Sequence, residues 1–105
     1  MSGHYILDGK RPVPVSMDVW AVWFGKADRK VEITKIDDEV SVSTVFLGLD
    51  HSFGHGPPMV FETLVFGGEH DGEMSRYSTW EQAVNGHFET VDRLTGNNIV
   101  PLSNK

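Results

Sequence analysis

The middle of the chain, residues 40–68, consists of two strongly apolar runs separated by a loop of quite different composition. The first run reads VSVSTVFLGL and the second reads MVFETLVF, while the loop between them reads DHSFGHGPP. Runs this rich in β-branched and aromatic residues favour buried strands. Glycines and prolines mark turns. We therefore expect two neighbouring buried strands joined by a loop, residues 50–58, that carries candidate chemistry.

Two helices are expected, one before these strands and one after them. The first covers residues 17–24, because Ser16 suits an N-cap and the following residues repeat apolar side chains at helical spacing. The second covers residues 79–94, where Ser78 and Glu81 have the spacing of a capping box. Both helices have an apolar face, so both are expected to pack against the sheet.

Alternating or continuously apolar segments predict the strands. The sheet strands are expected over residues 30–36, 40–49, 59–66 and 74–77. Residues 11–15 contain two prolines two positions apart, which restricts them to an edge strand or an extended arm. The chain is therefore expected to have an α+β fold, with an antiparallel sheet of three to four strands and two helices packed on one face.

The length of 105 residues predicts a single α+β domain over residues 1–105. We expect an ordered core over about residues 5–95 and a loosely ordered tail over residues 96–105. The net charge of −6 argues against general electrostatic binding to nucleic acid. The absence of cysteine excludes disulfides and thiolate metal sites and suits a reducing cytosol.

The start of the chain, MSGHYILDGK, lacks the basic stretch and apolar core of a signal peptide. No apolar run approaches the roughly 18 residues that a membrane span needs. We therefore expect a cytoplasmic protein without a membrane segment.

Several strings in the chain resemble a family of small, uncharacterised proteins encoded by bacteriophages and prophages. They are VSTVFLGLDH, GPP and FETLVFGG in the middle of the chain, RYSTWE and GH further on, and YILDGK near the start. The resemblance covers most of residues 5–90. It implies a phage or prophage origin, and hence the host cytoplasm as the location. It implies no activity and no functional residues.

The loop holds the first set of candidate site residues. Asp50, His51 and His55 are potential ligands, and the two histidines could hold zinc, iron or manganese. In a glycine-rich loop, however, a spacing of four residues fixes no shared geometry. The plainer interpretation is that Asp50 and His51 cap the strand end and hydrogen-bond the backbone of the turn.

Glu62 and His87 form the second set. Glu62 lies among large apolar residues of a predicted strand, so it either sits at a solvated edge, pairs with Arg76 on a neighbouring strand, or acts as a general acid or base. His87 lies on the apolar face of the second predicted helix. It is either a core histidine with satisfied hydrogen bonds or, if that helix covers Glu62, half of a carboxylate–histidine pair.

These observations leave three functions open. We expect first a phage-type module that binds a host or phage protein without turnover and forms a homo-oligomer through its open sheet edges. The alternative is a small-ligand or nucleotide-binding protein whose pocket is lined by loop 50–58, Arg76 and His87. The third is a metal-dependent or acid–base enzyme, with no cofactor other than a metal ion. Its candidate residues are His51, His55, Glu62 and His87.

Overall fold

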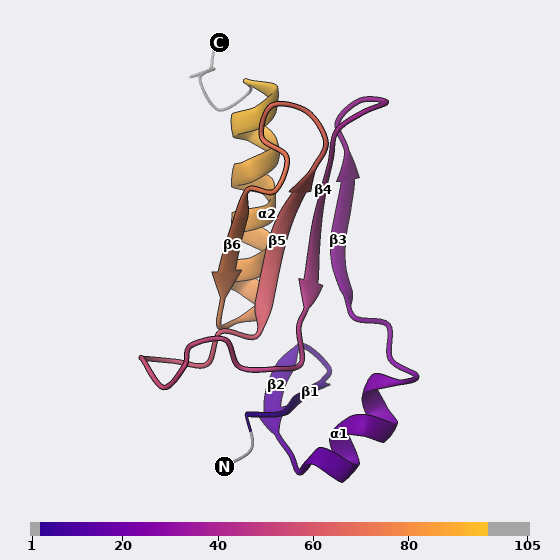
Figure 1. Ribbon diagram of the computed structural model, residues 1–105, viewed down its shortest axis with the longest axis vertical. Coiled ribbons are helices and arrows are strands. Elements are labelled where there is room, and N and C mark those ends of the chain that lie inside the picture. The colour runs from indigo at the N-terminus through magenta and orange to yellow at the C-terminus, as the bar shows by residue number, and fades with distance from the viewer. Residues whose placement is uncertain (1–2, 97–105) are drawn as a thin grey trace.

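The computed structural model describes residues 3–96, so the predicted tail, apart from Gly96, lies outside the described residues. Two short strands open the described chain and pair as a hairpin. A helix, four further strands and a second helix follow (Figure 1). The elements are β1 (Tyr5–Asp8), β2 (Arg11–Pro14), α1 (Met17–Phe24), β3 (Lys30–Lys35), β4 (Ser41–Phe46), β5 (Phe61–Phe66), β6 (Met74–Tyr77) and α2 (Trp80–Thr95).

The four later strands form an antiparallel sheet in the order β3-β4-β5-β6, so each strand pairs with its neighbour in the chain. Side chains alternate between the two faces of this sheet. On the face covered by α2, the residues of the two central strands are buried. They are Val42, Thr44 and Phe46 on β4 and Phe61, Thr63 and Val65 on β5. The predicted α+β class with an antiparallel sheet is confirmed.

The second helix begins one residue later than predicted. Thr79, not Ser78, is the N-cap: its hydroxyl accepts the backbone N–H of Gln82, and the Gln82 side chain accepts the backbone N–H of Thr79 in return. The Ser78 hydroxyl instead donates to the sulfur of Met59. The predicted Ser78–Glu81 capping box is therefore wrong, whereas Gly96 ends the helix in the left-handed conformation, as expected.

The glycine within α2 is explained by close packing. A Cβ atom at Gly86 would lie 2.2 Å from the hydroxyl oxygen of Tyr77 and 2.4 Å from two of its ring carbons. The Tyr77 ring, at the end of β6, therefore rests directly on the backbone of the helix. This contact offsets the roughly 1 kcal/mol that glycine costs in a helix interior.

The first helix has the predicted bounds but a different position. It contacts β1 and lies at the far end of the molecule from the tip of β3, whereas α2 alone lies along the sheet (Figure 1). Trp20 stacks on Phe24, and both rings approach Gly48 so closely that a Cβ atom there would be 3.0 Å from each. The contact just beyond the end of β4 holds α1 below the sheet.

A chain of aromatic rings joins the hairpin, α1 and the sheet. Trp23 of α1 meets Phe46 edge-on, Phe46 meets Phe61, and Phe61 meets Trp80 at the start of α2. Tyr5 of the hairpin is buried in the same cluster. The molecule is elongated, with principal extents of 50 × 27 × 24 Å. One hydrophobic core joins the hairpin and α1 to the four-stranded sheet and α2.

Candidate functional site

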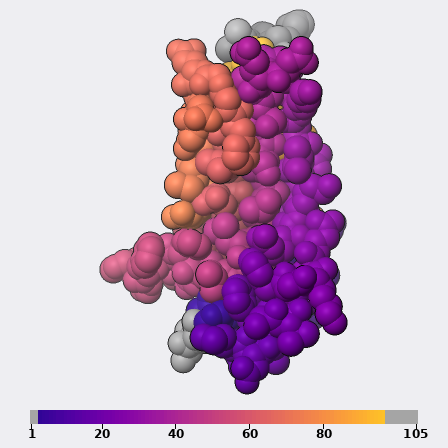
Figure 2. Space-filling model, turned by 45° about the vertical axis from the view of Figure 1, so that its right-hand side comes forward, coloured from indigo at the N-terminus to yellow at the C-terminus, as the bar shows by residue number. Residues whose placement is uncertain are grey.

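The loop of residues 50–58 is fixed at its base and projects from the molecule at its tip (Figures 1 and 2). The Asp50 carboxylate accepts the backbone N–H groups of Ser52 and Met59 at 2.7 and 3.0 Å. Partial burial alone would raise the pKa of Asp50, but these hydrogen bonds outweigh burial and lower it. The interpretation of Asp50 as a residue that hydrogen-bonds the turn backbone is confirmed.

The histidines of this loop do not gather into a metal centre. His51 lies edge-on to Phe53, with ring centroids 6.5 Å apart, and His55 is exposed. Among residues 3–96, no three His, Asp or Glu side chains come together as metal ligands would. The tip instead presents Phe53, which is 81% exposed and has a φ of 55°. A positive φ is uncommon for a residue other than glycine, so the backbone of Phe53 adopts an unusual, left-handed conformation.

Glu62 lies on the face of the sheet opposite α2, because the adjacent residue Thr63 is buried beneath the helix. Its carboxylate accepts a hydrogen bond from Arg76 on β6 at 3.1 Å, and the two residues are direct neighbours in the strand register. The predicted Glu62–Arg76 pair is confirmed. The conditional Glu62–His87 pair is wrong, since the sheet separates the two side chains.

His87 is fully buried beneath the sheet and both ring nitrogens have partners. Its Nδ1 lies 2.8 Å from the hydroxyl oxygen of Thr44, and its Nε2 lies 2.8 Å from that of Thr34. Thr44 is in turn 2.6 Å from the hydroxyl oxygen of Thr63. His87 is therefore a core histidine with satisfied hydrogen bonds. We call these four residues the polar layer.

The polar layer predicts a specific pH dependence of stability. Burial lowers the pKa of His87 below its ordinary value of 6.5, although the negative charge of Glu32 opposes the shift. Below pH 6.5 the unfolded chain therefore takes up a proton that the folded protein does not. Between pH 6.5 and the lower pKa of His87 in the folded protein, we expect the free energy of unfolding to fall by up to about 1.4 kcal/mol for each pH unit of acidification. Above pH 6.5, His87 should cause no change of the free energy of unfolding with pH.

Urea unfolding between about pH 7 and pH 5 measures this effect, in the range where histidine titrates. His87→Gln is the control because it removes the titrating group from the polar layer. If the free energy of unfolding changed equally with pH in the wild type and in the variant, the prediction would be contradicted.

A groove of about 610 Å³ lies between the C-terminal end of β6 and α2. Arg76 lines it, together with Pro57 and Met59 at the end of the loop, but His87 does not. The expected pocket of loop, Arg76 and His87 is thus only partly present. The remaining lining residues are Tyr77, Ser78, Thr79, Gln82, Asn85, Gly86 and Glu89.

The outer side of α1 forms a second surface of interest. Asp18 is the one polar residue of this helix, and no residue of the helix is buried. Met17, Val19 and Val22 are 60%, 49% and 64% exposed, and we call these three residues the α1 surface. Val19 and Val22 also line a shallow groove of about 480 Å³, together with Ile6, Asp18 and Trp23.

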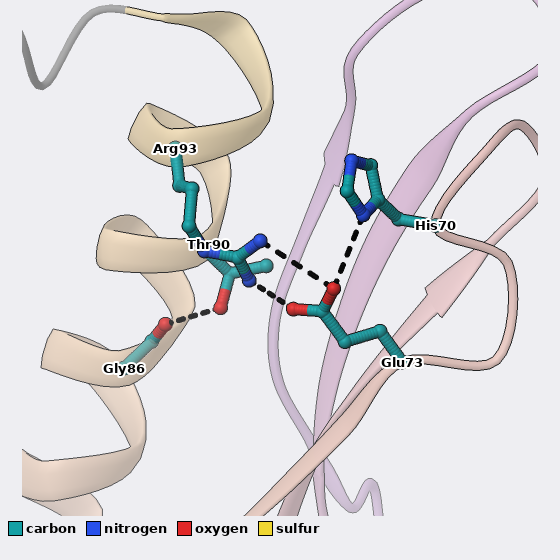
Figure 3. A network of polar contacts seen from close by, with 5 residues as sticks. All are labelled: His70, Glu73, Gly86, Thr90 and Arg93. Atoms are coloured by element: carbon teal, nitrogen blue, oxygen red, sulfur yellow. Dashed lines mark hydrogen bonds and ion pairs between the residues drawn. The ribbon is translucent and has the colours of Figure 1, made fainter.

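A third group of polar residues, at the other end of α2, is structural (Figure 3). The Arg93 guanidinium binds the carboxylate of Glu73, and His70 lies 3.3 Å from the same carboxylate. The hydrogen bond from Arg93 lowers the pKa of Glu73, and slight burial opposes this. Thr90 donates to the carbonyl oxygen of Gly86 within the helix. This network ties the loop before β6 to the last turns of α2.

The chain matches no known family model, no curated protein and no solved structure. The resemblance to phage-encoded proteins therefore stays a prediction. Among the described residues, no helix is both long enough and apolar enough to span a membrane.

Sequence reasoning included a core histidine with satisfied hydrogen bonds at position 87, but it missed the α1 surface and the threonine partners of His87 in the polar layer. The signal for the first was visible, because an eight-residue helix with a single polar residue has more apolar surface than one contact can cover. The signal for the second was the pair Thr44 and Thr63, which occupy equivalent inward positions in two apolar strands.

Proposed function

We propose that this chain is a phage-type protein that acts by binding a host or phage protein, without turnover. The observation that carries the proposal is the α1 surface. A helix with so little polar surface is normally buried, yet five of the eight residues of α1 are exposed. Covering Met17, Val19 and Val22 with a partner would remove this exposed apolar area from water.

Charge supports a partner with a basic rim. Asp18 lines the same groove as Val19 and Val22, and the chain carries a net charge of −6. An apolar patch flanked by Lys or Arg would complement this surface and would associate faster at low salt. The partner would lie in the cytoplasm of the host cell, where a phage-encoded protein is made.

The test compares capture of proteins from a bacterial host lysate by the wild type, by Val22→Glu and by Ile33→Glu. Ile33 is 54% exposed on β3, so it receives the same change on a different face. We expect a partner that the wild type and Ile33→Glu retain. Its purified form should bind Val22→Glu at least about tenfold more weakly, a loss of 1.4 kcal/mol.

Two results would count against this proposal. One is equal capture by all three proteins. The other is a wild-type dimer, seen in sedimentation, that Val22→Glu dissociates, because it would assign the α1 surface to self-association.

A further inference from the structure

Strand β6 forms one edge of the four-stranded sheet. Within residues 3–96, β5 is the one strand that pairs with β6. The backbone carbonyls of Glu73 and Tyr77 accept N–H groups from the β5 side, at 2.9 and 3.0 Å. Backbone groups alternate in direction along a strand, so those of Met74 and Arg76 point to the open edge. A row of unpaired donors and acceptors is a template for another strand.

The groove beside this edge has a helix as its second wall. Gln82, Asn85, Gly86 and Glu89 line it, and these positions fall on one face of α2. Pro57 of the loop and Met59, which follows the loop, belong to the same lining. An extended segment of four residues, about 13 Å long at 3.3 Å per residue, matches the length of β6. The volume of about 610 Å³ also falls within the usual range of ligand sites.

The polar groups of the groove indicate which peptide it suits. The Gln82 side-chain oxygen accepts the backbone N–H groups of Ser78 and Thr79, which leaves its amide NH₂ available. Arg76 is neutralised by Glu62. Glu89 is exposed and belongs to none of the ion pairs formed among residues 3–96. The uncompensated charge of the groove is therefore negative.

We propose that the groove between β6 and α2 binds an extended peptide segment of a partner protein, which adds to β6 as a fifth strand and directs a basic side chain to Glu89. The backbone groups of Met74 and Arg76 supply the affinity that is independent of sequence, and the α2 wall selects the side chains. A second copy of the chain suits the groove less well. The β6 strand of a second copy offers Arg76 as its basic side chain, and Glu62 of that same copy already neutralises this arginine.

The first experiment selects a displayed library of random heptapeptides on the full chain. We expect the recovered peptides to share one position enriched in Lys or Arg. A synthetic peptide of the recovered sequence should then shift the backbone amide resonances of residues 74–78 and 82–89. Failure to recover any peptide, or shifts confined to other residues, would overturn the proposal.

The second experiment tests the edge itself with two variants of one residue. Arg76→Pro removes the N–H that points to the open edge, and proline is tolerated at such positions on edge strands. Arg76→Val removes the same side chain and the same ion pair but keeps the N–H. We expect the selected peptide to bind Arg76→Pro at least about tenfold more weakly than Arg76→Val. Only the proline variant loses the backbone N–H of residue 76, and with it the hydrogen bond to the peptide and the adjacent contacts that this bond aligns. Equal affinities, with both variants folded by circular dichroism, would overturn strand addition.

The third experiment exchanges the charge of the α2 wall. Glu89→Lys should reject the basic peptide and accept its counterpart in which Lys or Arg is replaced by Glu, while Glu89→Gln should bind both similarly. An unchanged preference in Glu89→Lys would overturn the assigned partner chemistry. A wild-type dimer that Arg76→Pro dissociates would assign the edge to a second copy instead.

This inference is independent of the α1 surface. If the selected peptide fails to bind while the partner of the α1 surface is still captured, the present inference alone is wrong. The opposite result would leave the groove assigned and overturn the function proposed for α1.

Discussion

Gly67→Ala is expected to lower the free energy of unfolding by about 3 kcal/mol or more. Gly67 has a φ of 86°, and a Cβ atom there would lie 1.8 Å from the carbonyl oxygen of Glu39. The left-handed conformation costs an alanine roughly 1–2 kcal/mol. The clash adds to this because its other side is backbone, which cannot move aside as a flexible side chain can, and overpacking costs about 1–3 kcal/mol.

Gly72→Ala is the matched control for this prediction. Gly72 has a φ of 88° but nothing within 4 Å of the added Cβ. It should therefore show the conformational cost alone, roughly 1–2 kcal/mol. Urea unfolding of both variants measures the difference. Equal losses would show that the turn holding Glu39 can move away from Gly67 without cost.

His87→Ala is expected to cost about 3–5 kcal/mol, comparable to the loss of a buried aromatic ring. The substitution empties a fully buried site and also leaves the hydroxyl groups of Thr34 and Thr44 without the ring nitrogens that they contact at 2.8 Å. An unsatisfied buried polar group alone costs about 1–3 kcal/mol. Chemical denaturation near neutral pH, where His87 is uncharged, measures the loss without a titration effect.

Phe88→Ala provides the control, because Phe88 is the next residue of α2 and is 43% exposed. Its loss should cost about 1 kcal/mol. A second comparison isolates the polar contribution. His87→Leu alone should remain destabilised, whereas His87→Leu combined with Val at positions 34, 44 and 63 should regain much of the loss, since replacing all hydrogen-bond partners by apolar groups is close to neutral. A combined variant no better than His87→Leu would contradict this account.

The limits of what the sequence could predict are clearest at Glu62. The alternation of side chains along β5 correctly places Glu62 and Thr63 on opposite faces of the sheet. Both faces of β5 carry large apolar residues, however, so the pattern does not say which face the helix covers. The packing of α2 on the sheet decides which face is covered, and this packing depends on contacts between segments that are far apart in the sequence. The sequence thus predicted the Glu62–Arg76 neighbours on adjacent strands, but it could not exclude the Glu62–His87 pair.

Helix boundaries were predictable where a cap has a single candidate. Ser16 precedes α1, and the predicted bounds of that helix match the structure. At α2 two adjacent residues, Ser78 and Thr79, are both good caps, and in the structure Thr79 caps the helix while the Ser78 hydroxyl contacts Met59. The position of α1 was not predictable, because a helix with apolar residues on every side does not show which side is covered.

The polar layer also determines which strand alignments this chain can adopt. Thr44 stands directly opposite Thr63, and the two hydroxyl groups bond each other beneath the helix. A shift of β5 by two residues would keep the same face inward, yet it would set Thr44 against Phe61 or Val65 and leave the Thr63 hydroxyl in the core without the Thr44 hydroxyl as its partner. A layer of valines would tolerate such a slip. The four hydrogen-bonding residues therefore favour one register of β4 and β5, and they disfavour alternative registers that hydrophobic burial alone would allow.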